Sequence, residues 1–195
     1  MSVLPPGSSF IATNPLEATV TYLQVSLLAG TFLSSPIILY QVWRFVVPGL
    51  YVHEKRLAAV FVSCATFFFV GGAFFGYSLI FPVGFRFFVK VLEGTHIQFL
   101  PQMQNYLGFI SKMMLTFGAI FEIPLLIVIL ARIGVIQLYM LKRARRYVLV
   151  GMFLIAGILT PGPDVLSQAL LAVPLLLLYE LSIIAVWVMT KRTKV

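Results

Sequence analysis

Acidic residues are scarce in this sequence. The 195 residues include six Asp and Glu against fourteen Lys and Arg, and charged residues of both signs make up only 10% of the chain. Hydrophobic residues make up 61%, and the mean hydropathy is +1.03. A soluble domain needs more charge than this to cover its surface, so the composition indicates an integral membrane protein.

Cysteine and histidine are almost absent. Cys64 is the single cysteine, which excludes an intrachain disulfide and a cysteine metal site. His53 and His96 fall in different expected loops without metal-ligand spacing, so we expect no metal and no cofactor. The chain also lacks a P-loop, a GxGxxG fingerprint, an HExxH pair and a GxSxG elbow. We therefore expect a protein that is not an enzyme.

The formal charge of +8 does not indicate nucleic acid as a partner, because the basic residues cluster between apolar runs. Cytoplasmic loops of membrane proteins collect Lys and Arg. Eleven of the fourteen basic residues fall in three segments that we assign to the cytoplasm: Arg44, Lys55, Arg56, Arg132, Lys142, Arg143, Arg145, Arg146, Lys191, Arg192 and Lys194. This distribution predicts an inner-membrane protein in contact with lipid, its N-terminus outside and its C-terminus in the cytoplasm.

Five apolar runs predict an all-α, polytopic membrane domain over residues 1–195, with residues 1–17 as an outer loop. The expected spans are about 18–41, 57–81, 106–131, 147–160 and 165–189. A span needs about 20 apolar residues to cross the hydrocarbon core. The fourth run has only 14 residues, and Pro174 and Glu180 divide the fifth. We therefore expect the last two spans to be short.

The segments around these spans carry their own expectations. Pro48-Gly49 lies in the first cytoplasmic loop, residues 41–56, and Arg132 to Arg146 is expected to form the second. Residues 1–17 contain no Lys or Arg. Nothing there would drive an outer N-terminus across the membrane. Either a preceding membrane segment is missing, or the short uncharged N-terminus crosses unaided, and we favour a missing segment.

Glu122 is the most unusual residue of the third run, because it lies about four residues past the middle. A charge at such depth costs roughly 2.5–3.5 kcal/mol on insertion scales, so it usually faces a cavity or a partner. The alternative is a carboxyl that is protonated or bonded to a neighbouring helix. Pro124 follows, frees the carbonyl of Ile120 and favours a kink. These features alone also fit a proton- or ion-coupled small-solute transporter.

Six blocks of the sequence carry a resemblance to a known family. They are 15–17 (PLE), 36–43 (PIILYQVW), 45–54 (FVVPGLYVHE), 117–124 (FGAIFEIP), 146–151 (RYVLVG) and 159–168 (LTPGPDVLSQ). In this order the blocks resemble TatC, the multispanning core subunit of the twin-arginine protein translocase. The family has six spans, so five remain in this chain, and the resemblance again places the missing segment before Met1.

The resemblance implies export of folded proteins, driven by the proton-motive force, after recognition of a twin-arginine signal peptide. It implies single-span partners of the TatA and TatB type and a homo-oligomer within the complex. It places signal-peptide binding at Phe45, Pro48 and Glu54, because the position matching Glu54 contacts the arginine pair. We expect Glu122, Pro124 and Glu180 to make intramembrane polar or partner contacts, and Glu17 and Asp164 to lie in outer loops.

Overall fold

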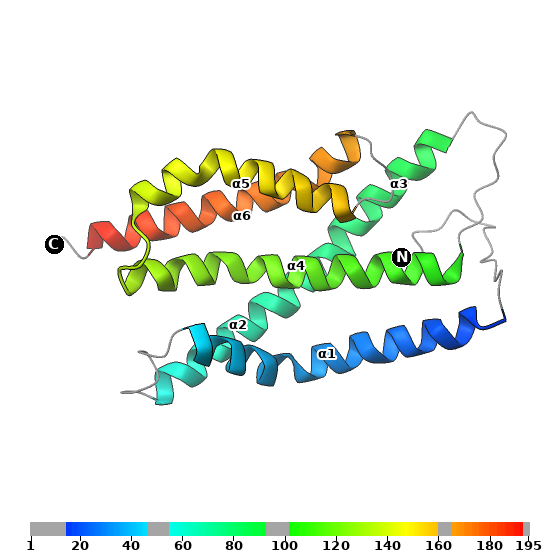
Figure 1. Ribbon diagram of the computed structural model, residues 1–195, viewed down its shortest axis with the longest axis horizontal. Coiled ribbons are helices and arrows are strands. Elements are labelled where there is room, and N and C mark those ends of the chain that lie inside the picture. Colours follow the sequence, from blue (N-terminus) through cyan, green and yellow to red (C-terminus); the bar gives the residue numbers. More distant parts are fainter. Residues whose placement is uncertain (1–14, 47–54, 93–101, 160–164, 193–195) are drawn as a thin grey trace. The chain divides into compact units, whose positions relative to one another are not determined.

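The chain folds into helices. The computed structural model describes residues 15–46, 55–92, 102–159 and 165–192, and no strand is present in these ranges. The helices are α1 (Glu17–Val46), α2 (Lys55–Phe75), the π-helical turn η2 (Gly76–Ile80), α3 (Phe81–Leu92), α4 (Met103–Arg132), α5 (Leu138–Leu159) and α6 (Val165–Arg192) (Figure 1). The prediction of an all-α fold is confirmed.

Each of the five expected spans falls in a helical part of the chain. Among the described residues, four stretches are long and apolar enough to cross a membrane: Glu17–Phe45, Val60–Arg86, Met103–Arg132 and Leu171–Lys191. The helix α5 is not one of them, because basic residues occupy its first turns. The exact limits of the spans and the single-domain reading of residues 1–195 stay predictions.

The structure corrects the second cytoplasmic loop. We expected a loop from Arg132 to Arg146, but α5 begins at Leu138 and includes most of this basic run. Residues 138–146 are Leu, Tyr, Met, Lys, Arg and Ala, mostly strong helix formers, and Gly and Pro are absent. The actual turn is short. Gly134 adopts a φ of 81°, and the N–H groups of Val135 and Ile136 donate to the carbonyl of Leu130 at 2.9 and 3.1 Å, which ends α4.

Two prolines leave different marks on their helices. Pro124 lies inside α4, which is assigned as one helix from Met103 to Arg132. Pro82 follows η2 and lacks the N–H that an α-helix needs, so the regular pattern cannot continue there. The N–H of Phe81 instead donates to the carbonyl of Gly76, five residues earlier. This π-helical turn joins α2 to α3 and was not predicted from the sequence.

The chain divides into two compact units, Met1–Gly118 and Ala119–Val195, with the boundary inside α4. Aromatic side chains hold the first unit together. Trp43 meets Phe61 edge to face at 4.7 Å between ring centroids, and Phe32 lies 5.5 Å from Phe69, so α1 packs on α2. A second cluster joins α3 to α4: Phe81, Phe85 and Ile110 at its centre, with Tyr106, Leu107, Phe109 and Met114 around them.

Two glycines allow the closest approach within the first unit. A Cβ on Gly76 would lie 3.0 Å from the Cβ of Phe117, and a Cβ on Gly118 would lie 3.0 Å from the backbone oxygen of Phe69. Both distances are tighter than nine in ten real Cβ contacts. The α2–η2 segment and α4 therefore pack at a separation that larger residues at these positions would prevent.

In the second unit, α5 and α6 run side by side (Figure 1). Arg145 pairs with Glu180, and Gly157 lies next to Gln168. Positions that rise along α5 meet positions that fall along α6, so the two helices are antiparallel. The buried Tyr179 hydroxyl also donates to the carbonyl of Leu141 at 2.8 Å.

The glycine contacts give the first prediction. Gly118→Ala should destabilise the protein by about 1–3 kcal/mol, because the new methyl group meets the backbone of Phe69, which cannot rotate away. Gly71→Ala is the matched control on α2, where a Cβ would meet nothing within 4 Å. The control should be neutral or gain up to about 1 kcal/mol in helix propensity. Denaturant titration of the purified protein in detergent measures both. Equal stability of the two variants would contradict the close approach.

Candidate functional site

Phe45 is the one predicted signal-peptide residue within the described part of the chain. It lies in the last turn of α1 and is 86% exposed. Pro48 and Glu54 lie outside the described residues. A large aromatic ring with this exposure at the end of a helix is free to pack against another molecule.

Trp43 lies near the end of α1 and is buried against α2. Its side chain is only 3% exposed and contacts the ring of Phe61 on α2. The indole Nε1 is buried and has no hydrogen-bond partner in the described chain. Trp43 therefore fixes the end of α1 against α2 and leaves Phe45, two residues later, on the exposed side. The burial of Trp43 depends on packing against α2 that the sequence alone does not show.

Glu122 lies on α4 within the second unit. Both of its carboxylate oxygens are buried, although the residue as a whole is only half-buried. Pro124 is half-buried on the same helix. A carboxylate shielded in this way is costly to charge in an apolar environment, which fits an interior position better than a lipid-facing one. Contact of Glu122 and Pro124 with a partner stays a prediction.

Glu180 has a partner within its own chain. Its Oε2 accepts a hydrogen bond from Nη2 of Arg145 at 2.6 Å, with the two side chains 44% and 51% exposed. The pair links α6 to the basic first turns of α5. Arg145 lies one turn along α5 from Leu141, whose carbonyl accepts the hydroxyl of Tyr179. Arg145 is one of five basic residues between 132 and 146, and nothing in the sequence alone singles it out.

The two predicted outer-loop acids differ. Glu17 is the first residue of α1 and is 3% exposed, so it does not lie in an open loop. Its Oε1 accepts the backbone N–H of Gln104, in the first turn of α4, at 3.1 Å. A carboxylate at this place satisfies one of the free N–H groups that every helix start presents and interacts favourably with the helix dipole. Asp164 lies outside the described residues.

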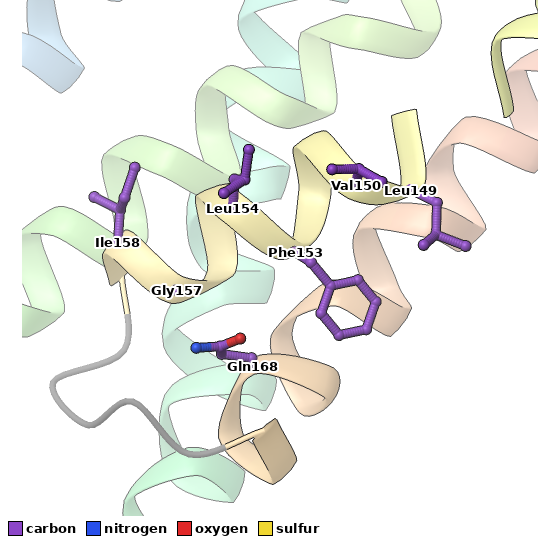
Figure 2. A pocket seen from close by; sticks show the side chains of 7 residues that line it. All are labelled: Leu149, Val150, Phe153, Leu154, Gly157, Ile158 and Gln168. Atoms are coloured by element: carbon purple, nitrogen blue, oxygen red, sulfur yellow. The ribbon is translucent and has the colours of Figure 1, made fainter. Parts of the chain in front are cut away.

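A hollow of about 480 Å³ lies against α5 in the second unit. Six residues of α5 and one of α6 line it: Leu149, Val150, Phe153, Leu154, Gly157, Ile158 and Gln168 (Figure 2). Gln168 supplies the one polar side chain among them. Its amide lies over Gly157, where an added Cβ would come within 3.3 Å of Nε2. Gly157 falls in the expected span 147–160 and Gln168 in the block 159–168, but the sequence alone does not bring the two residues together.

Metal binding finds no support in the geometry. No group of three or more His, Cys, Asp or Glu in the described ranges is arranged to hold an ion. The candidate features are described unit by unit. The first unit has an exposed aromatic at the end of α1. The second unit has a shielded carboxylate on α4 and an apolar hollow with one amide on α5 and α6.

The sequence and the fold both resemble known proteins. A family described as "Sec-independent protein translocase protein (TatC)" matches residues 2–174. A TatC protein of Desulforapulum autotrophicum is 44% identical over 192 residues, which cover 98% of this chain and 70% of the relative. A TatC protein of Escherichia coli K12 is 40% identical over 182 residues, 92% of this chain and 69% of the relative.

A solved structure shares the fold. It is described as the crystal structure of a twin-arginine translocase receptor, TatC, and it superposes with a TM-score of 0.84 at 35% identity. The superposition covers 95% of this chain and 81% of the other. The likeness therefore extends over both units of the chain and not only over a shared helix pair.

The ion pair of the second unit gives the second prediction. Glu180→Arg should destabilise the α5–α6 pair by placing two guanidinium groups together, and the added change Arg145→Glu should restore most of the loss. Because both side chains are about half exposed, the coupling energy is expected to be about 0.2–1 kcal/mol. A double-mutant cycle in detergent measures it by thermal unfolding. Arg143→Glu combined with Glu180→Arg is the control, because Arg143 does not contact Glu180, and it should not rescue stability. Rescue by both pairs alike would assign the effect to net charge alone.

Proposed function

Because this chain belongs to the TatC family of Sec-independent protein translocase proteins, we propose that it binds twin-arginine signal peptides and exports folded proteins with the energy of the proton-motive force. The chain is a multi-pass membrane protein and a component of a protein transport system. The observation that carries the proposal is that the family match includes the whole segment from Phe45 to Glu54, where we predict the signal to bind.

The chemistry of the signal fits this segment. Two adjacent guanidinium groups call for carboxylates, which accept them in short, charge-assisted bonds. Glu54 is the only acid of residues 41–56. The exposed ring of Phe45 adds an apolar or cation–π contact beside the charged pair. Burial of Trp43 against Phe61 holds the end of α1 in place, so the position of Phe45 is fixed before a signal binds.

The third prediction concerns Glu54. Glu54→Ala should weaken binding of a twin-arginine signal by about 1.5–3 kcal/mol, roughly ten- to a hundredfold in affinity, because one charge-assisted bond is lost. Glu54→Arg should abolish binding by repulsion of like charges. The measurement is photocross-linking of a signal peptide in membranes, with a twin-lysine signal for comparison. Glu93→Ala removes an acid that we place on the opposite side and is the matched control. If Glu54→Ala and Glu93→Ala cross-link equally well, Glu54 is only a solvated loop acid.

We propose further that single-span partners of the TatA and TatB type dock on α5 at the hollow. Leu154 and Ile158 are 64% and 84% exposed, so an apolar face is offered to the membrane. In lipid, helices associate through small residues that permit close approach and through polar side chains that bond across the interface. Gly157 and Gln168 supply one of each. The occupant that fits is an apolar helix carrying one polar side chain at the level of Gln168.

Glu180 on α6 and Glu122 on α4 have different roles in this proposal. The bond between Glu180 and Arg145 gives Glu180 a structural role at one end of the α5–α6 pair. Glu122 has a shielded carboxylate, and we propose that it makes a polar contact with partner helices within the membrane. We place the N-terminus of this chain outside, its C-terminus in the cytoplasm of the inner membrane, and several copies in one complex.

The fourth prediction tests the hollow. Gly157→Leu fills it, and Gln168→Leu removes its polar group, so both should reduce cross-linking of a single-span partner to α5. The loss of one interhelical hydrogen bond in lipid is worth about 0.6–2 kcal/mol, so Gln168→Leu should lower the yield several-fold. Gly151→Leu is the control on the same helix, where an added side chain meets nothing within 4 Å and does not line the hollow. Signal-peptide cross-linking should stay normal in all three variants. Unchanged partner yield in Gly157→Leu would move the docking site elsewhere.

A further inference from the structure

The first turns of α1 are polar on the inside and apolar on the outside. Glu17 and Thr21 are only 3% and 1% exposed, and Gln24 is half-buried. In the same turns Leu23 and Leu27 are 61% and 73% exposed. The spacing of four and three residues puts Glu17, Thr21 and Gln24 on one face of the helix. This face points into the first unit, which is the reverse of a soluble helix.

The polar face of α1 meets α4. The carboxylate of Glu17 accepts the N–H of Gln104, and the amide of Gln24 lies against Gly108, one turn further along α4. Thr21 lies between these two contacts along α1. We call these five residues the polar seam: Glu17, Thr21, Gln24, Gln104 and Gly108. Gly108 has no side chain, and the amide of Gln24 lies over it, with Nε2 3.3 Å from where a Cβ would stand.

Two polar atoms of the seam find no partner in the described chain. They are Oγ1 of Thr21 and Oε1 of Gln24, and both are buried. Other hydroxyls of α1 show the usual solution, because Ser26 and Thr31 donate to carbonyls four residues earlier at 2.8 and 2.9 Å. Thr21 is more deeply buried than either and does not do so. A buried hydroxyl or amide oxygen without a partner costs about 1–3 kcal/mol.

We propose that the polar seam binds water between α1 and α4, reaching from the Glu17 end of the helices at least as far as Gln24. Water supplies both a donor for Oε1 of Gln24 and an acceptor for the hydroxyl of Thr21. Buried water typically makes about three hydrogen bonds to polar groups that the protein leaves unsatisfied. The seam offers such groups in a row. The face of α1 that carries Leu23 lies in hydrocarbon and stays dry.

Cysteine accessibility tests the seam in the full-length chain. Cys64 is replaced by alanine, and single cysteines are placed at Thr21, Gln24, Leu23 and Leu27. Unsealed membranes are treated with a charged, membrane-impermeant methanethiosulfonate, which reaches both sides of the bilayer. The reagent attacks the thiolate, and a thiol ionises only where water reaches it. Thr21→Cys and Gln24→Cys should react at least about tenfold faster than Leu23→Cys and Leu27→Cys, because hydrocarbon disfavours the charged form.

A second variant distinguishes a water-filled seam from a loosened fold. Adding Gly108→Leu to Gln24→Cys places a side chain where the Gln24 amide lies in the unchanged chain, so labelling of Gln24→Cys should fall several-fold. Adding Gly71→Leu on α2, where an added Cβ meets nothing, should leave the labelling rate unchanged. Labelling at Thr21 and Gln24 that is as slow as at Leu23 would show a dry seam and overturn the proposal. Labelling that Gly108→Leu does not slow would overturn it as well.

Discussion

The structure depends on one constraint of the membrane: a polar group that cannot reach water must find its partner inside the protein. Several of the described polar side chains satisfy this constraint. Hydroxyls of α1 bond to carbonyls of their own helix. The Tyr179 hydroxyl bonds to the backbone of α5, and the Arg145 guanidinium bonds to Glu180 on α6. Because the alternative in lipid is an unsatisfied group, these few bonds decide which helix faces pair.

Close packing of complementary shapes provides the attraction between helix faces that carry no polar bonds. Lipid tails are as apolar as a leucine side chain, so apolar helices gain little merely by meeting each other. Close packing has to supply the attraction, and the first unit obtains it from glycines set against phenylalanines. Gly118 receives the backbone and ring of Phe69, and Gly76 receives Phe117. The polar bonds then set the register, and the glycine contacts set the distance between helices.

The sequence predicted the helices well and their contacts poorly. Long apolar runs favour helices, so the described residues of all five expected spans are helical. Charge misled at α5, because hydropathy treats a basic run as a loop although Leu, Lys, Arg and Ala favour a helix. Several basic residues lie near Arg145 in the sequence. The register between α5 and α6 must be known to identify Arg145 as the one that pairs with Glu180. Gly157 and Gln168 are eleven residues apart, and only the antiparallel pairing brings them to one hollow.

The acids bear on the proposed binding of a signal peptide. The chain has six acids, and three of them are described. Glu17 accepts the N–H of Gln104, Glu180 pairs with Arg145, and the carboxylate oxygens of Glu122 are buried. A guanidinium pair from another protein would have to break these contacts. The other three are Glu54, Glu93 and Asp164, and the charge pattern places the last two on the outer side. Signal peptides arrive from the cytoplasm, so our proposal places their arginine pair at Glu54, the acid that the charge pattern assigns to that side.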